Sequence, residues 1–344
     1  MTRPRRWAPL LGALVLAGCG ADPSDAGVVG VTVADGLSVS VVADGFDGPT
    51  QIAAIPGGDL IVAELNGTER EGNGRVLAVA RDDPTARIVL VEGLVAPTGV
   101  AVDGDLLWVM EQRRLTVSPL TDPADRTVVL DELPFNGRSE GSLTTVEPAG
   151  IVYDTSGSRD PSRPAELRRG SGSLWMLRSP DADPVPLATG FKHAYGHVVD
   201  SDGELWSTEM SDGRLDGRVP PDELVRVRTG DDFGYPRCVG DRVPVTELGA
   251  DDALCGSTPR SHALFEPGAT PTSVAVAPWD PDLLVVALWN RGEVAAVPRW
   301  AADTPHVPDV LVAGLDNPQH LVADGDRLLL TEFSGGRLLE IRPS

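Results

Sequence analysis

Short apolar runs of four to six residues, rich in Val, Ile, Leu and Thr, alternate along the chain with glycine, proline and acidic residues. Leu60–Ala63, Leu107–Met110 and Leu328–Thr331 are examples. No stretch keeps apolar residues at a spacing of three or four over the length of a helix. The pattern therefore predicts many short β-strands and few helices.

One arrangement of these runs recurs six times. A copy begins with glycine and an apolar residue, continues through a polar step that often contains proline, and then has successive strand-like runs with an acid between them. Copies begin at or near Gly45, Gly93, Ile151, Gly190, Pro271 and Gly314, the third copy being degenerate. Short strands at a repeat of about 40 to 50 residues are typical of propeller blades. We therefore predict an all-β fold, a six-bladed β-propeller over residues 37–344.

The first residues have the pattern of an export signal. Arg3, Arg5 and Arg6 precede an apolar stretch over residues 7–16, which is shorter than the roughly 20 residues that a membrane-spanning helix needs. Leu16-Ala17-Gly18-Cys19 resembles a bacterial lipobox, in which the cysteine thiol takes the lipid. The alternative is an ordinary signal peptide that contains a cysteine by chance.

This pattern predicts a lipoprotein signal peptide at 1–18 and a Gly-containing acidic tether at 19–36. The protein is then expected in the cell envelope, exported and lipid-anchored, with the anchor as its only contact with the membrane.

Composition limits the classes of partner. The chain has 344 residues with 29 Lys or Arg and 51 Asp or Glu, a formal charge of −22, and 41% of its residues are hydrophobic. That hydrophobic content supports a packed core rather than disorder. The negative excess repels phosphate, so we expect no nucleic-acid partner and no binding to anionic lipid. We expect a monomer.

Two cysteines, Cys238 and Cys255, remain after Cys19. An even remainder in an exported protein favours a disulfide. A metal site has less support because no Cys-x-x-Cys motif or nearby histidine pair completes it. Two buried free thiols are the other alternative.

Five of the six repeats carry an acid at the same position. These residues are Glu64, Glu111, Asp154, Glu209 and Glu332. If the repeats superpose, the carboxylates approach one end of the central channel, where a hard cation such as Ca²⁺ would relieve their mutual repulsion. The equally supported alternative is that each acid caps a turn of its own strand and faces water.

A set of motifs lies in the second half of the chain, from residue 190 onward. They are Gly190-Phe-Lys-His-Ala-Tyr-Gly196, Pro220-Pro-Asp-Glu-Leu224, Asp232-Phe-Gly-Tyr-Pro-Arg-Cys238, Leu288-Trp-Asn-Arg291, and Cys255 followed by Thr258-Pro259. Together they give the chain a resemblance to the glucose/sorbosone dehydrogenase family. It implies a six-bladed propeller that oxidises a sugar or sugar aldehyde with pyrroloquinoline quinone (PQQ), the cofactor supplying the hydride chemistry.

By the same resemblance, Lys192 and Arg291 are the candidate cofactor-binding residues. Asp222 and Glu223 match an acidic turn that binds Ca²⁺ in some members. The expected cofactors are therefore PQQ and Ca²⁺.

The chain also departs from the family pattern. Members carry a histidine general base before the first strand of the third repeat, whereas residues 120–190 contain no histidine here. A hydride acceptor still needs a base for the hydroxyl proton of the substrate. His193, His197 and His320 are the candidates for a replacement, each of them weak.

Three functions follow from these observations. One is a PQQ-dependent sugar or aldehyde dehydrogenase with a rearranged base. Another is a non-catalytic envelope propeller that binds a carbohydrate or a protein. The third is a metal-dependent lactonase, for which the sequence shows no clear ligand pattern.

Overall fold

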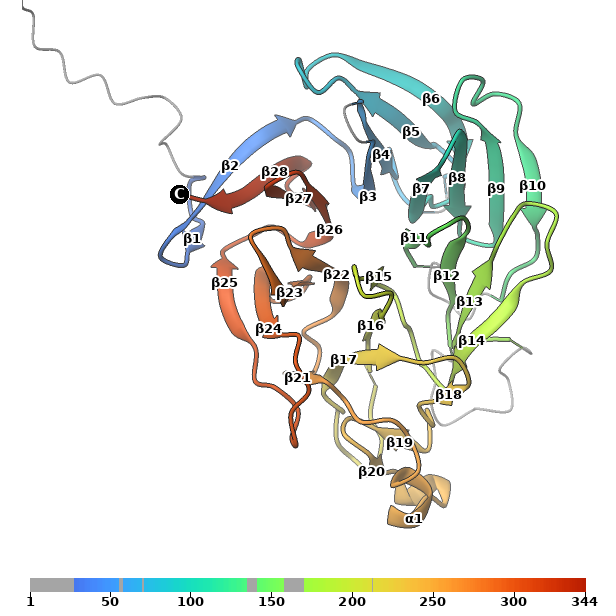
Figure 1. The fold of residues 1–344 in the computed structure, drawn as a ribbon, viewed down its shortest axis with the longest axis vertical. Coiled ribbons are helices and arrows are strands. Elements are labelled where there is room, and N and C mark those ends of the chain that lie inside the picture. Colours follow the sequence, from blue (N-terminus) through green and yellow to red (C-terminus); the bar gives the residue numbers. More distant parts are fainter. Residues whose placement is uncertain (1–27, 56–57, 70, 135–140, 158–169, 212) are drawn as a thin grey trace, which may run out of the picture.

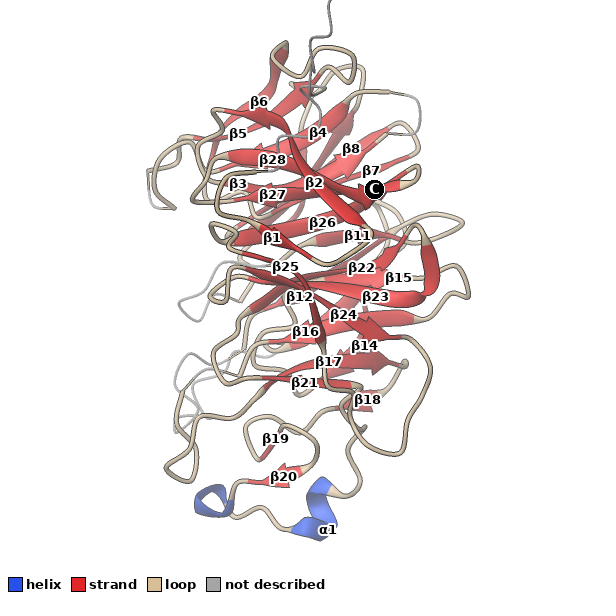
Figure 2. Cartoon of the chain, turned by 90° about the vertical axis from the view of Figure 1, so that its left-hand side faces the viewer, coloured by secondary structure: helices blue, strands red, loops and turns tan. Residues whose placement is uncertain are grey.

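Six twisted antiparallel sheets stand around a common axis in the computed structural model (Figure 1). The structure describes residues 28–344 except 56–57, 70, 135–140, 158–169 and 212. The prediction of an all-β, six-bladed propeller is confirmed. In the view turned by 90°, the strands of the blades lie one above another (Figure 2).

Each blade is a meander that starts with its innermost strand. The first blade contains β3 (Pro49–Ala54), β4 (Leu60–Glu64), β5 (Gly74–Val79) and β6 (Arg87–Leu94). The second contains β7 (Gly99–Asp103), β8 (Leu106–Glu111), β9 (Arg114–Pro119) and β10 (Thr127–Leu130). The third contains β11 (Leu143–Thr145), β12 (Ile151–Thr155), β13 (Ser173–Leu177) and β14 (Val185–Thr189), with β18 (Asp231–Asp232) parallel to β14.

The other three blades repeat this order. The fourth contains β15 (His197–Val199), β16 (Leu205–Glu209), β17 (Asp222–Val227) and β21 (Ala263–Phe265). The fifth contains β22 (Pro271–Ala277), β23 (Asp280–Leu288), β24 (Glu293–Pro298) and β25 (Asp309–Ala313). The sixth contains β26 (Pro318–Asp324), β27 (Arg327–Glu332) and β28 (Arg337–Pro343), followed outward by β2 (Leu37–Asp44) from the other end of the chain.

The ring is closed by strands from the two ends of the sequence. β2 pairs antiparallel with β28, with Val39 opposite Ile341, so the sixth blade joins the start of the propeller to its end. β1 (Thr32–Val33) adds a strand to the outer edge of β25. The propeller therefore includes Thr32 and Val33, which were predicted to belong to the tether. β1 and β2 each cover the edge of a strand that would otherwise be open.

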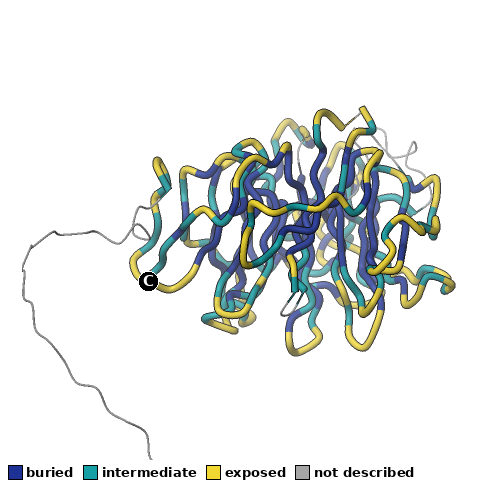
Figure 3. Tube along the Cα trace, turned by 90° about the horizontal axis from the view of Figure 1, so that it is seen from above, coloured by how far each residue is buried: buried dark blue, intermediate teal, exposed yellow. Residues whose placement is uncertain are grey.

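Hydrophobic contacts between neighbouring blades form the core. On β27, Leu329 packs with Ile52 and other residues of the first blade. Leu328 and Leu330 point the other way and pack with Val285 of the fifth blade. Because both faces of a blade are covered, its strands are apolar at consecutive positions rather than alternately. Figure 3 shows the resulting pattern, with buried strands inside and exposed loops at both faces.

A long connection between β17 and β21 carries the non-propeller structure. It contains the hairpin of β19 (Cys238–Val239) and β20 (Val243–Pro244), the 3-10 turn η3 (Thr246–Leu248) and the short helix α1 (Asp252–Cys255). A disulfide joins Cys238 to Cys255, which confirms the predicted pairing. Within the described part of the chain, no helix is long and apolar enough to cross a membrane. The proposed signal, Cys19 and most of the tether lie outside the described residues.

Candidate functional site at the channel mouth

One end of the central channel opens into a cavity of about 330 Å³, which we call the channel mouth. Its lining residues lie at the start of an innermost strand or just after the second strand of a blade. They are Thr50, Leu65, Glu69, Thr98, His193, Tyr195, Met210, Thr270, Thr272, Trp289, Gln319 and Phe333. Five of the six blades therefore contribute described residues to one concave surface.

The lining is polar but almost uncharged. Four threonine hydroxyls and the Gln319 amide offer hydrogen bonds, and Gln319 Nε2 donates to the Tyr195 hydroxyl at 2.7 Å across the channel. The rings of Trp289 and Phe333 lie side by side, with their centroids 4.8 Å apart. Glu69 is the one acid among the described lining residues, and none of these residues is Lys or Arg.

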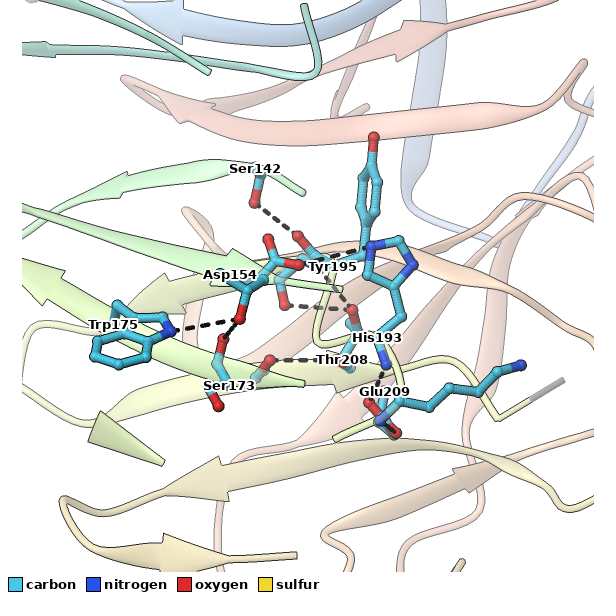
Figure 4. Close-up of polar contacts among 12 residues, drawn as sticks. Ser142, Asp154, Ser173, Trp175, His193, Tyr195, Thr208 and Glu209 are labelled. Carbon is cyan, nitrogen blue, oxygen red and sulfur yellow. Dashed lines mark hydrogen bonds and ion pairs between the residues drawn. The ribbon is translucent and has the colours of Figure 1, made fainter. Parts of the chain in front are cut away.

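A histidine–aspartate pair lies at the base of the mouth (Figure 4). His193 Nε2 lies 3.6 Å from Asp154 Oδ2, and the exposed fractions of the two side chains are 3% and 0%. The Tyr195 ring meets the His193 ring edge-on, with centroids 5.2 Å apart. A carboxylate beside an imidazole orients the ring and stabilises its protonated form, so this pair can accept a proton from a ligand hydroxyl.

Burial raises the pKa of Asp154 well above its usual range, and the backbone N–H of Gly141 opposes that shift. The approach of Gly141 is close, since a Cβ added there would lie 2.0 Å from Asp154 Oδ1. Glycine at 141 is therefore needed to seat this carboxyl.

Glu209, at the end of β16, holds the segment that carries His193. Its carboxylate accepts hydrogen bonds from the backbone N–H groups of Lys192 at 2.6 Å and of His193 at 3.1 Å (Figure 4). Burial is the largest cause that raises the pKa of Glu209, and the two backbone donors oppose it.

The repeated glutamates of the first, second and sixth blades make the equivalent hydrogen bond. Each accepts a hydrogen bond from the backbone N–H two residues after the glycine of its repeat. The pairs are Glu64 with Asp47 at 3.0 Å, Glu111 with Val95 at 2.8 Å, and Glu332 with Asp316 at 2.6 Å. Arginines complete each set: Arg75 with Glu64, Arg126 with Glu111, and Arg337 with Glu332.

None of these four glutamates lines the mouth. They anchor the loop that leads into each innermost strand, as the capping alternative predicted. The expectation that they face water is wrong, because all four are buried. Asp154 is the exception: it is one methylene shorter and faces His193. Asp154 and His193 were predicted separately, as a channel acid and as a weak candidate base, and their pairing was not predicted. The replacement of glutamate by aspartate in the third repeat is the sequence signal that could have found it.

The predicted cofactor-binding cations do not meet at the mouth. Lys192 is fully buried and is not among its lining residues. Arg291 forms ion pairs with Glu266 at 3.0 Å and Glu293 at 3.6 Å, on a half-exposed side chain outside the lining. Glu293 is on β24 of the fifth blade, and Glu266 directly follows β21 of the fourth.

The predicted calcium ligands also bind protein groups. Asp222 accepts hydrogen bonds from the backbone N–H groups of Ser211 at 2.7 Å and Thr270 at 2.8 Å. Glu223 accepts one from the Ser261 hydroxyl, and burial raises the pKa of Glu223 to about 7. Asp222 and Glu223 are consecutive on β17, so their side chains leave opposite faces of the strand. Among the residues that the structure describes, no group of three or more His, Cys, Asp or Glu could hold a metal ion.

His197 and His320 lie deeper, and both line a second cavity of about 380 Å³ at the far end of the channel. His197 Nδ1 is 2.8 Å from the Thr144 hydroxyl. Burial lowers the pKa of each histidine to about 3. Both rings are therefore neutral and weakly basic near pH 7, which leaves His193 as the candidate base that reaches the mouth.

No protein-family model and no curated protein matches the sequence. Solved structures do match. A calcium structure of the *Trichoderma reesei* carbohydrate-active enzyme family AA12 is 16% identical, with a TM-score of 0.78 over 92% of this chain and 97% of that one. The PQQ domain of pyranose dehydrogenase from *Coprinopsis cinerea*, in its holo form, is 18% identical, with a TM-score of 0.74 over 91% and 97%.

The PQQ-bound aldose sugar dehydrogenase from *Streptomyces coelicolor* is 17% identical, with a TM-score of 0.69 over 91% of this chain and 100% of that one. The structural neighbours are thus PQQ-dependent sugar dehydrogenases and AA12 enzymes. The chain shares their six-bladed propeller fold.

The described residues of the mouth do not fit PQQ. The cofactor carries three carboxylates, which need cations around them when they are taken out of water. The described lining offers hydroxyls, an amide, aromatic rings and the carboxylate of Glu69, without a cation. Lys192 and Arg291 were expected to supply the positive charge. Lys192 is buried outside the lining of the mouth, and Arg291 is ion-paired with glutamates.

Proposed function

We propose that the channel mouth binds an uncharged sugar. The observation that carries this proposal is the lining itself: four threonines, one amide and three aromatic rings converge on a concave surface, and its described residues include one acid and no cation. Concave sites of a few hundred Å³ with a few convergent polar groups are typical of small-ligand binding.

The lining suits a polyhydroxylated ring. The Thr50 and Thr272 hydroxyls donate to the backbone oxygens of Pro97 and Pro318, so they offer acceptor lone pairs to sugar hydroxyls, as does the amide oxygen of Gln319. The Trp289 and Phe333 rings supply flat apolar area for the C–H faces of a sugar. Glu69 and the charge of −22 disfavour an anionic ligand at this place.

Calorimetric titration with a panel of neutral mono- and oligosaccharides tests the proposal. We expect one sugar class to bind and Trp289→Ala to weaken its affinity by about tenfold or more. Trp300→Ala is the matched control, because Trp300 is 61% exposed and does not line the mouth. Absence of binding across the panel, or equal losses in both variants, contradicts the proposal.

Oxidation of the bound sugar with PQQ is the second candidate, favoured by the His193–Asp154 pair. In this case His193 accepts the proton of the sugar hydroxyl, and Asp154, 3.6 Å away, orients its ring. PQQ would supply the hydride acceptor. Sugar binding ranks above oxidation because the described mouth does not fit this cofactor.

The two candidates separate in one set of measurements. Thermal unfolding with PQQ and Ca²⁺ reports cofactor binding, since a ligand at 100 times its dissociation constant stabilises by about 2.7 kcal/mol. Dye reduction with the bound sugar reports oxidation. If oxidation occurs, His193→Asn should abolish it while keeping sugar affinity. If the wild-type protein shows neither cofactor binding nor dye reduction, oxidation is rejected and sugar binding stands.

A metal-dependent lactonase has less support. That chemistry needs a carboxylate-bound cation in the channel, and the described residues contain no cluster of ligands for one.

A further inference from the structure

A groove of about 630 Å³ lies beside the disulfide, apart from the channel mouth. It lies between the outer part of the fourth blade and the long connection that carries the β19–β20 hairpin and α1, at the edge of the propeller (Figure 1). Five arginines line it: Arg226, Arg228, Arg237, Arg242 and Arg260. We call it the arginine groove.

This concentration of positive charge is unusual for the chain, whose formal charge is −22. The acids that line the groove are Asp231 and Asp232. Both are engaged in turns, Asp231 with the backbone N–H of Arg228 at 2.8 Å and Asp232 with that of Gly234 at 2.9 Å. Arginines therefore outnumber acids among the lining residues, which makes the groove a candidate site for an anion.

Three of the arginines are held in place by protein groups. Arg226 is paired with Glu204, and Arg260 is paired with Asp241. Arg242 Nε donates to the backbone oxygen of Thr258 at 2.7 Å. These contacts fix the guanidinium groups along the wall. All three nitrogens of Arg260 donate to protein groups, Nε and Nη2 to Asp241 and Nη1 to the backbone oxygen of Asp303, so Arg260 contributes positive charge rather than free donors.

The other two arginines have no such contact. Arg228 and Arg237 are both exposed, and neither side chain has a hydrogen bond or ion pair with any described residue. The wall between them is rigid, because Arg237 directly precedes the disulfide-bonded Cys238, which also lines the groove. The guanidinium groups of Arg228 and Arg237 have no acid partner in the described part of the chain. A guanidinium group is planar and can bind a carboxylate through two parallel hydrogen bonds.

We propose that the arginine groove binds a small anionic ligand with two or more carboxylates. The site is independent of the sugar site, because the groove and the mouth share no lining residue. The volume of the groove lies within the range of small-molecule sites. Arg228 and Arg237 are the residues we expect to contact the ligand, with the three held arginines completing the positive wall.

Calorimetric titration of the purified chain with citrate, a tricarboxylate, tests this inference, and acetate is the single-carboxylate comparison. We expect citrate to bind, acetate to bind far more weakly, and added salt to weaken citrate binding because the ligand is held by charge. The double variant Arg228→Gln/Arg237→Gln should lose at least about tenfold in citrate affinity.

Arg113→Gln/Arg178→Gln is the matched control. It makes the same change in net charge at two exposed arginines that do not line the groove. It should bind citrate as the wild type does. Thermal unfolding of each variant checks that the fold is intact.

The inference is overturned if the wild type does not bind citrate, if the groove variant retains wild-type affinity, or if the control loses as much. Sugar titrations separate the two sites. The groove variant should bind neutral sugar normally, so a failure at the mouth and a failure at the groove are distinguishable. Binding of sulfate as tight as that of citrate would also overturn the assignment to polycarboxylates.

Discussion

Replacing Glu332 with alanine should lower the free energy of unfolding by about 3 to 5 kcal/mol without changing sugar affinity at the mouth. Glu332 is fully buried, its carboxylate accepts the backbone N–H of Asp316 at 2.6 Å, and it is ion-paired with Arg337. The variant tests whether the repeated acids hold the loops of the blades or serve a ligand.

The magnitude follows from these two contacts. Hydrogen bonds to charged groups contribute about 1.5–3 kcal/mol each. Breaking a buried ion pair by removing one partner costs about 3–5 kcal/mol, because the other partner is left uncompensated. The Arg337 side chain is 26% exposed and can regain some hydration, so we expect the loss to fall near 3 kcal/mol.

Urea denaturation followed by fluorescence measures the change, with the slope of the transition checked for two-state behaviour. Glu92→Ala is the control, since Glu92 is an exposed glutamate on β6 and its removal changes the charge equally. The control should shift stability by less than about 0.5 kcal/mol. A loss below about 1 kcal/mol for Glu332→Ala, or a stable variant that no longer binds sugar, would refute the structural role of this acid.

Three further changes have defined outcomes. Burial raises the pKa of Glu223 from 4.5 to about 7, so its contribution to stability is largest below about pH 4.5 and is lost as pH rises through 7. Glu223→Gln should therefore remove about 3 kcal/mol of the pH dependence between pH 5 and pH 8, and an unchanged pH profile in urea denaturation would contradict this. Replacing Cys238 and Cys255 by serine should cost about 3 kcal/mol, measured by the same method, because the disulfide closes a loop with a sequence separation of 17; a loss near zero would show that the connection is ordered without it. We also propose that Cys19 carries a lipid in the cell envelope; Cys19→Ala should abolish lipid labelling and release the protein from membranes, and unchanged membrane association would reject the anchor.

The sequence by itself determined the architecture. Its six repeats and the absence of helical periodicity specify blades, because a strand buried on both faces needs consecutive apolar residues such as Leu328–Leu330. The disulfide followed from the two cysteines left after Cys19. These features are predictable because each depends on local pattern or on counting.

The site was decided by the tertiary structure. Glu209 and Asp154 occupy the same position in their repeats, yet Glu209 accepts two backbone N–H groups of its own blade and Asp154 faces His193 from the next one. The difference depends on one methylene and on how two blades are packed. No periodicity within a single repeat contains that information.

The positive charge was also placed by the fold. Lys192 and Arg291 match a family pattern, but burial and nearby glutamates keep them from the mouth. Arg228 and Arg237 match no pattern, and they converge only because the connection after β17 returns along the outside of the fourth blade under the constraint of the disulfide. Strand periodicity predicts on which face of a blade a residue lies. Which charged side chains come together is decided by the packing of separate segments, and this packing depends on contacts between residues far apart in the sequence.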